Sequence, residues 1–254
     1  MRTIVVIPTY NERPNLARLV PAILDANVDS TIDVLVVDDA SPDGTGELAE
    51  MLAEANPAVH VIHRQGKLGL GTAYLAGFQY ALRRGYDLVV EMDADFSHRP
   101  EDLPALIAAA RGADVVIGSR WVRGGKAVGW SPLRRLLSEG GSLYARWLLD
   151  LPVLDCTSGF KCFRRSALET LDLDAIHSSG YAFQVEVNYL CRRNGLRLAE
   201  VPITFPDRAE GESKMSLRIV LEAWWLVLAS AVHERTGMAG HKHPLAPTSV
   251  GQAA

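Results

Sequence analysis

The chain has 254 residues, which is enough to bury a sizeable core, and we expect one large domain with an appendage. Its net charge of -4 and isoelectric point near 6.0 argue against nucleic acid as a partner, because phosphate-binding domains usually carry a basic surface. The cysteines Cys156, Cys162 and Cys191 form no Cys-x-x-Cys pair, so neither a disulfide framework nor a zinc site is predicted. A reducing cytoplasm fits this composition.

Two apolar stretches bear on membranes. Residues 3–8 (TIVVIP) resemble a strand and are not preceded by a basic region, so we expect no signal peptide. Residues 223–232 (AWWLVLASAV) reach about half of the roughly 20 residues that a membrane-spanning helix needs. Two explanations stay open for this segment: a helix packed in the core, or an interfacial helix with Trp224 and Trp225 at headgroup level.

The first 120 residues alternate between short β-branched runs and segments of helical spacing. The predicted strands are 3–7, 32–39, 59–63, 87–93 and 113–118, and the predicted helices are 14–26, 44–55 and 69–85. Such alternation indicates βαβ units and a Rossmann-like α/β fold, with a mostly parallel sheet flanked by helices. In this architecture ligands bind beyond the carboxyl ends of the strands.

The rest of the chain has a different character. Residues 120–135 form a basic, glycine-rich predicted loop, residues 136–150 a predicted helix, and a mixed segment follows to about 205. We divide the chain into a ligand-binding half at 1–120, a second half at 121–236 and a tail at 237–254. The tail is rich in Gly, Pro, Ala and His, and we expect it to be disordered with solvated histidines.

Polar clusters follow four of the predicted strands. They are residues 8–12 (PTYNE), 38–45 (DDASPDGT), 93–98 (DADFSH) and 118–121 (GSRW). Each alone is explained by ordinary turn residues, but together they would line one edge of the sheet. That edge would be strongly anionic, since it holds Glu12, Asp38, Asp39, Asp93 and Asp95. A hard divalent cation, Mg²⁺ or Mn²⁺, would neutralise such crowding, and a nucleotide diphosphate would complete its coordination.

In this order, PTYNE, VVDDASPDGT, DADFSHRPE and GSR resemble the motifs of family 2 inverting glycosyltransferases, which have a GT-A type fold. Residues 38–47 and 207–216 (DRAEGESKMS) are similar to polyprenol (dolichol) phosphate mannose synthases, and the resemblance covers about residues 1–220. It implies transfer of mannose from GDP-mannose to polyprenyl phosphate with inversion. Some relatives carry a long C-terminal transmembrane region that this chain lacks, so a peripheral position at the cytoplasmic face of a membrane, with a possible integral membrane partner, is implied.

The resemblance also implies roles for single residues. The nucleoside would be held by Pro8, Tyr10, Glu12, Val37 and Asp39. Metal and sugar diphosphate would be bound by Asp93, Ala94 and Asp95, with Ser97 standing where some relatives have a Gln as third ligand. The donor or acceptor phosphates would be contacted by Arg120, Arg134, Ser138, Arg208 and Lys214, among which Arg134 and Ser138 would receive the acceptor phosphate. Surface solubility is the ordinary explanation for a lone arginine.

A phosphate acceptor removes the need for a catalytic base. Its second pKa is near 6, so it is largely dianionic at neutral pH, and neither His98 nor His177 is assigned as a base. Four alternatives are weighed against this reaction. A UDP-glucose donor would use the same residues, a sugar nucleotidyltransferase lacks the expected Gly-rich loop with its lysine, a polysaccharide synthase would need several spanning helices, and a non-catalytic nucleotide-binding module predicts a damaged set of motifs.

Overall fold

The structure is a computed structural model, and it describes residues 1–26, 28, 30–176, 178 and 180–207. The expectations for His177, Arg208, Lys214, the 223–232 segment and the 237–254 tail fall outside these residues.

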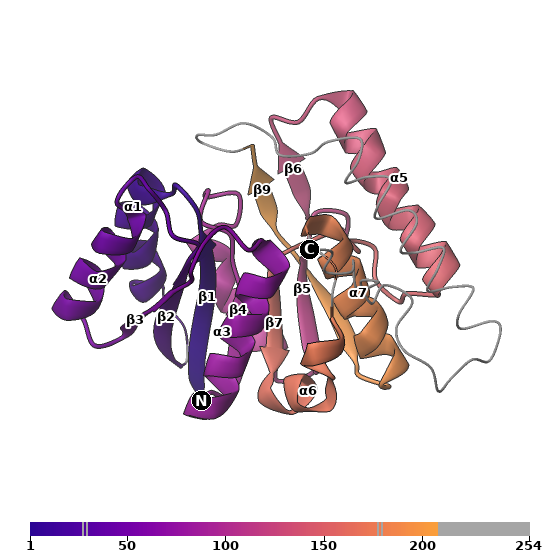
Figure 1. Ribbon diagram of the computed structural model, residues 1–254. Coiled ribbons are helices and arrows are strands. Elements are labelled where there is room, and N and C mark those ends of the chain that lie inside the picture. Colours follow the sequence, from indigo (N-terminus) through magenta and orange to yellow (C-terminus); the bar gives the residue numbers. More distant parts are fainter. Residues whose placement is uncertain (27, 29, 177, 179, 208–254) are drawn as a thin grey trace, which may run out of the picture.

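A seven-stranded sheet forms the centre of the fold, in the order β3-β2-β1-β4-β7-β5-β8 (Figure 1). Its strands are β1 (Arg2–Thr9), β2 (Thr31–Asp38), β3 (Val59–His63), β4 (Leu88–Glu91), β5 (Val115–Ser119), β7 (Lys161–Arg164) and β8 (Leu198–Pro202). Only β7 is antiparallel to its neighbours within this described sheet. A separate parallel pair is formed by β6 (Lys126–Val128) and β9 (Thr204–Pro206). The prediction of a mostly parallel α/β sheet is confirmed.

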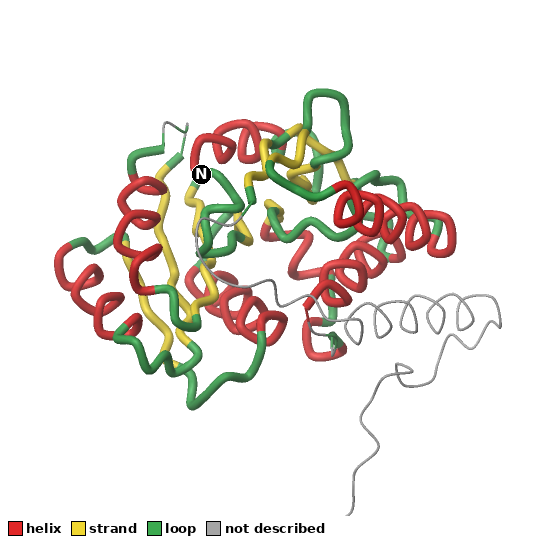
Figure 2. Tube along the Cα trace, turned by 90° about the horizontal axis from the view of Figure 1, so that it is seen from above, coloured by secondary structure: helices red, strands yellow, loops and turns green. Residues whose placement is uncertain are grey.

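Helices cover both faces of the sheet (Figure 2). They are α1 (Arg13–Leu24), α2 (Thr45–Ala55), α3 (Leu70–Arg84), α4 (Leu103–Ala109), α5 (Pro132–Leu149), α6 (Arg165–Thr170) and α7 (Gly180–Arg193), with 3-10 turns η1 (Pro100–Asp102) and η2 (Leu173–Ala175). Successive residues of one strand pack on opposite faces: Val5 and Ile7 join the cluster under α1 and α4, while Ile4 and Val6 join the cluster under α3 and α7. Burial on both faces explains why these strands read as continuous apolar runs.

The predicted 120–135 loop is wrong in two places. Residues 126–128 are strand β6, and α5 begins at Pro132 rather than at 136. The helix begins early because the Ser131 hydroxyl accepts a hydrogen bond from the Arg134 backbone N–H (3.3 Å) and Pro132 occupies the first turn, where a missing N–H costs nothing. The mixed segment to 205 resolves into β7, α6, α7, β8 and β9.

Candidate active site

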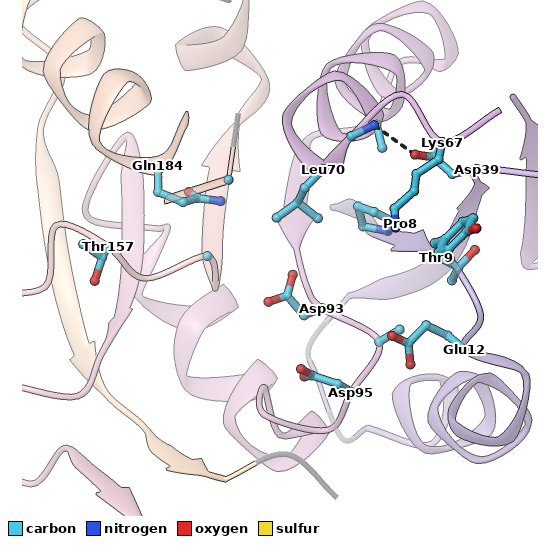
Figure 3. Close-up of a pocket in the computed structure, with 16 residues that line it drawn as sticks. Pro8, Thr9, Glu12, Asp39, Lys67, Leu70, Asp93, Asp95, Thr157 and Gln184 are labelled. Atoms are coloured by element: carbon cyan, nitrogen blue, oxygen red, sulfur yellow. Dashed lines mark hydrogen bonds between the residues drawn. The ribbon is translucent and has the colours of Figure 1, made fainter. Parts of the chain in front are cut away.

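A pocket opens at the carboxyl ends of β1, β2 and β4 (Figure 3). The predicted residues that line it are Pro8, Tyr10, Glu12, Asp39, Asp93, Ala94 and Asp95. They are joined by residues that were not predicted, among them Lys67, Leu70, Thr157, Gly159 and Gln184. The sheet edge chosen from the sequence therefore does gather these side chains around one cavity.

Asp39 is held firmly in the wall of the pocket. Its Oδ2 accepts hydrogen bonds from the backbone N–H groups of Leu68 (3.0 Å) and Gly69 (3.1 Å), and its Oδ1 lies 2.7 Å from Arg64 Nη1. These contacts fix the carboxylate in orientation. A fixed carboxylate of this kind suits the hydroxyl groups of a ribose.

Asp38 does not belong to the anionic edge, contrary to the sequence expectation. Its Oδ1 accepts from the hydroxyls of Thr9 (3.1 Å) and Ser41 (2.6 Å), its Oδ2 accepts from the Ser41 backbone N–H (3.1 Å), and it is absent from the pocket lining. The residue closes the turn after β2, which is the ordinary role of Asp at such a position.

Lys67 contributes a cation that sequence reasoning missed. Its Nζ lies 4.1 Å from the centroid of the Tyr10 ring, and both residues line the pocket. The available signal was the short basic, glycine-containing segment 64–69 (RQGKLG) after β3. A lysine beside an aromatic ring offers a point charge near a bound base or phosphate.

The carboxylates of Asp93 and Asp95 face the pocket and lie between Thr157 and Gln184 on one side and Pro8 and Asp39 on the other (Figure 3). Tyr74 donates its hydroxyl hydrogen to Asp93 Oδ1 (2.9 Å), and the Ser97 backbone N–H and hydroxyl donate to Asp95 Oδ1 (3.0 and 2.5 Å). Burial, with the nearby Asp93 charge, raises the pKa of Tyr74 well above its usual value, so this phenol stays a donor. Both carboxylates are thus oriented before any ligand binds.

His98 supports the carboxylate loop and is not placed as a base. It is 1% exposed, stacks on Phe160 with ring centroids 4.9 Å apart, and its Nδ1 accepts from the Asp93 backbone N–H (2.9 Å). That contact assigns the proton of the neutral ring to Nε2. Burial lowers the pKa of His98, so the ring is neutral at physiological pH.

The carboxylate oxygens in the pocket suit a hard divalent cation that takes only some of its ligands from the protein. Within the described ranges, no group of three or more His, Cys, Asp or Glu residues is placed to hold a metal ion. Ser97 is 1% exposed, does not line the pocket and donates its hydroxyl to Asp95. Asp93 and Asp95 would therefore be the protein ligands, which leaves coordination positions for phosphate oxygens and water, as Mg²⁺ and Mn²⁺ prefer.

Arg120 is locked in place by Asp155, a residue that the sequence did not single out. The Arg120 Nε and Nη2 donate to the two oxygens of Asp155 (2.7 and 2.6 Å), the backbone N–H of Arg120 adds a third bond (2.9 Å), and Nη2 also donates to Thr157 Oγ1 (2.8 Å). The pair is buried, with Arg120 4% and Asp155 0% exposed. Thr157 lines the pocket, so this network joins Arg120 to its rim.

Weakening this network is expected to destabilise the protein measurably. Replacing Asp155 by Asn keeps the shape but removes the charge opposite a buried guanidinium, and we expect a loss of about 2 kcal/mol in the free energy of unfolding. Urea titration followed by circular dichroism measures it. Asp150→Asn is the matched control, because the Asp150 side chain is 93% exposed beside Arg192, and an equal loss in both variants would contradict the role given to Asp155.

The remaining predicted residues lie outside the pocket lining. Val37 is fully buried in the core and does not line the pocket. Arg134 and Ser138 lie on α5, where the Arg134 Nη1 is 2.6 Å from Asp207 Oδ1 and the guanidinium covers the Trp130 ring at 4.1 Å. Arg120 lines a second cleft together with Trp121, Arg135, Leu143 and Arg146.

Cys156, Cys162 and Cys191 are all free and buried, and burial raises the pKa of each thiol to about 12. Across the described part of the chain, none of the helices combines the length and apolarity needed to cross a bilayer.

The chain has curated relatives over most of its length. It is 54% identical over 223 residues to the undecaprenyl-phosphate mannosyltransferase of Micrococcus luteus, covering 88% of this chain and 91% of that protein. It is 49% identical over 236 residues to the polyprenol monophosphomannose synthase of Mycolicibacterium smegmatis, covering 92% and 88%. The dolichol-phosphate mannosyltransferase of Pyrococcus furiosus is 39% identical over 227 residues, which span 87% of this chain and 61% of that longer protein.

A similar solved structure and a family profile agree with the similarity to these relatives. The glucosyl-3-phosphoglycerate synthase of Mycobacterium tuberculosis, solved with Mn²⁺, UDP and its product, superposes with a TM-score of 0.63 at 23% identity, covering 93% of this chain and 80% of that one. At this identity the match supports the fold alone. The profile of Glycosyl transferase family 2 matches residues 4–172. The chain therefore belongs to glycosyl transferase family 2 and is a glycosyltransferase.

Proposed function

We propose that the enzyme transfers mannose from GDP-mannose to a polyprenyl phosphate, with inversion, giving a β-linked polyprenyl phosphate mannose. The observation that carries the proposal is the pocket in which Asp39, from the end of β2, converges with Asp93 and Asp95, from the end of β4. Such a cavity suits a nucleoside at Asp39 and a diphosphate at the carboxylate pair. The names of the three relatives, all mannosyltransferases or mannose synthases for lipid phosphates, favour mannose and this acceptor.

Charge neutralisation is the main catalytic demand. A bound Mg²⁺ or Mn²⁺ would take up charge on the leaving diphosphate. The chain contributes the two carboxylates that hold the ion, with Ser97 fixing Asp95 and Tyr74 fixing Asp93. Pro8, Tyr10 and Glu12 line the nucleoside side, and the Ala94 backbone lies between the two carboxylates.

The acceptor enters without a base because it is already an anion. A phosphate monoester is largely dianionic at neutral pH, so its oxygen can attack the anomeric carbon directly. The neutral His98, committed to the Asp93 backbone, agrees with this chemistry. Arg134 and Ser138 of the second half of the chain, together with Arg120 at the end of the first half, supply cationic and hydroxyl groups where we place the acceptor phosphate, and Arg208 and Lys214 are proposed as further phosphate contacts.

We place donor binding in residues 1–120 and acceptor binding in 121–236. The second cleft supports this division, because it combines arginines with apolar side chains, the two properties that a lipid phosphate presents to a protein. Its described lining is Arg120, Trp121, Gly125, Arg135, Glu139, Leu143, Arg146 and Leu154. It adjoins α5, which also carries Arg134 and Ser138.

Helix α5 supplies an apolar surface suited to a membrane. Five of its large side chains are more than half exposed and recur at helical spacing on the face opposite the buried Ser142, Ala145 and Leu149: they are Leu133, Leu136, Leu137, Leu143 and Trp147. Arg135 and Arg146 line the second cleft next to Leu143 of this α5 stripe, and we propose that they complement anionic headgroups. We therefore propose a peripheral position on the cytoplasmic face of a membrane, with the stripe in the interface and room for an integral membrane partner.

Removing apolar bulk from the α5 stripe is expected to weaken vesicle binding roughly tenfold. The double variant Leu136→Ser and Trp147→Ser loses two side chains that are 67% and 74% exposed and would be buried in lipid. Co-sedimentation with phosphatidylglycerol vesicles measures the binding. Met51→Ser, which changes a 62% exposed residue on α2, is the control, and unchanged binding in the α5 variant would remove the stripe from the membrane proposal.

One experiment tests the reaction itself. Purified protein is incubated with radiolabelled GDP-mannose, Mg²⁺ or Mn²⁺ and a polyprenyl phosphate, and label is counted in the organic phase. Transfer from GDP-mannose supports the proposal. Transfer from UDP-glucose alone would establish the alternative donor, whose diphosphate would bind to the same residues. No transfer from either donor would overturn the proposal.

A further inference from the structure

The wall of the pocket opposite the nucleoside side has no assigned role. It includes Thr157 and Gln184, which lie across the carboxylate pair from Pro8 and Asp39 (Figure 3), and Gly159, which lies next to Gln184. If the nucleoside lies at Asp39 and the diphosphate at Asp93 and Asp95, the sugar of the donor extends toward this wall. Residues there are the ones placed to contact the group that is transferred.

Gln184 is the polar side chain of this wall with an unused hydrogen-bonding group. It is 3% exposed, lines the pocket, and its Oε1 accepts a hydrogen bond from the Lys161 ammonium. Because an ammonium group only donates, the amide oxygen must face Lys161 and the amide nitrogen must face away. Within the described residues Nε2 is buried and makes no hydrogen bond of standard geometry. The Gln184 side chain does contact Glu91 and lowers its pKa, but that contact occupies at most one of the two N–H groups of the amide.

Lys161 holds this orientation from below the pocket. It is fully buried on β7 directly opposite Glu91 of β4, with Nζ 3.9 Å from Glu91 Oε2. Neither residue lines the pocket. The ion pair therefore supports the Gln184 side chain and fixes the orientation of its amide, and it does not itself contact a ligand.

The space in front of the amide nitrogen is kept open by a glycine. A Cβ built on Gly159 would lie 3.3 Å from Gln184 Nε2 and 3.6 Å from the His98 ring. Gly159 also lines the pocket. The absence of a side chain at this position leaves the amide facing the cavity rather than a neighbouring carbon.

We propose that Gln184 is a sugar-binding residue, whose Nε2–H donates to a hydroxyl oxygen of the transferred hexose while Lys161 fixes the amide orientation. This inference rests on the proposed function, since it takes the donor to be a nucleotide sugar bound at Asp93 and Asp95. It adds a contact specific to the sugar that comes from the acceptor-binding half, whereas the groups that bind nucleoside and diphosphate belong to residues 1–120. Lys161 is a positioning residue.

The test compares a donor with its nucleotide product. GDP and GDP-mannose affinities are measured by calorimetry with Mn²⁺ for the wild type, Gln184→Met and Gly159→Ala. Both variants are expected to lose roughly tenfold in GDP-mannose affinity while GDP affinity changes less than about twofold, because only the sugar contact is removed. Gln79→Met, at a surface glutamine that contacts Asp174, is the control and should match the wild type.

Each outcome has a separate meaning. Equal losses for GDP and GDP-mannose, or no loss for either, would overturn the inference and leave the amide as a neutral partner of the Glu91–Lys161 pair. Gly159→Ala protects the conclusion if Gln184→Met folds poorly, because it leaves the amide and the ion pair intact. A wild type that binds neither GDP nor UDP with Mn²⁺ would instead overturn the proposed function.

Discussion

Replacing Asp95 by Ala is expected to lower sugar transfer about a thousandfold and to abolish metal-dependent nucleotide binding. The variant leaves Asp93 as the sole carboxylate of the pair, so a divalent cation would lose one of the two protein ligands proposed for it. The Asp95 carboxylate is 9% exposed and accepts a hydrogen bond from Ser97, so the substitution removes a carboxylate that is already oriented. Transfer to the organic phase and calorimetric titration of nucleotide with Mn²⁺ measure the two effects.

Two companion variants separate chemistry from folding. Asp174→Ala removes a surface carboxylate near Gln79 and should leave both measurements unchanged. Ser97→Ala keeps the carboxylate but removes the hydroxyl that orients it, and we expect a loss of roughly tenfold. If Asp95→Ala retained transfer and metal-dependent binding, the acidic pair would be an ordinary turn after β4.

The second large effect concerns stability. Lys161→Met should cost about 3–5 kcal/mol in the free energy of unfolding, because it leaves Glu91 buried without its opposite charge. Urea titration at neutral pH measures this loss. The double variant Glu91→Leu with Lys161→Met removes both charges and should recover much of it, whereas a double variant as unstable as the single one would contradict the explanation.

The same pair gives this loss a pH dependence of known sign. Burial raises the pKa of Glu91 from 4.5 to about 7, against the opposing effect of Lys161, so the folded state favours the neutral acid. A group with a raised folded pKa contributes stability that is fully present below its unfolded pKa and is lost as the pH rises through the folded one. The deficit of Lys161→Met should therefore be smaller at about pH 5 than at about pH 8, and a deficit independent of pH would place its origin elsewhere.

Much of the first half of the fold was predictable because its signals are local. Five apolar, β-branched runs identified β1 to β5, and the acidic and polar residues at their ends located the pocket. The prediction that Asp38 belongs to the anionic edge was wrong, because a carboxylate that closes a turn and one that faces a cavity have the same sequence signature.

The strands and helices after residue 120 were harder to predict, because several of their buried side chains are polar. Lys161 makes the short strand β7 look exposed, although it is fully buried against Glu91. Gln184, Glu186 and Asn188 are buried on α7, which hides the apolar periodicity of that helix. Their partners come from distant parts of the chain, so single-sequence patterns could not reveal Gln184 or Asp155 as parts of the site.

The antiparallel strand β7 also limits how the protein can be assembled. It hydrogen-bonds to β4 on one side and β5 on the other, so these two strands have no direct pairing with each other in the described sheet. A nascent chain that has emerged only to residue 120 would leave β4 unpaired on one side and β5 unpaired on both, and such exposed strand edges invite aggregation. Residues 1–120 are thus not a separable module, because the central sheet can be completed during synthesis only after Lys161–Arg164 have left the ribosome.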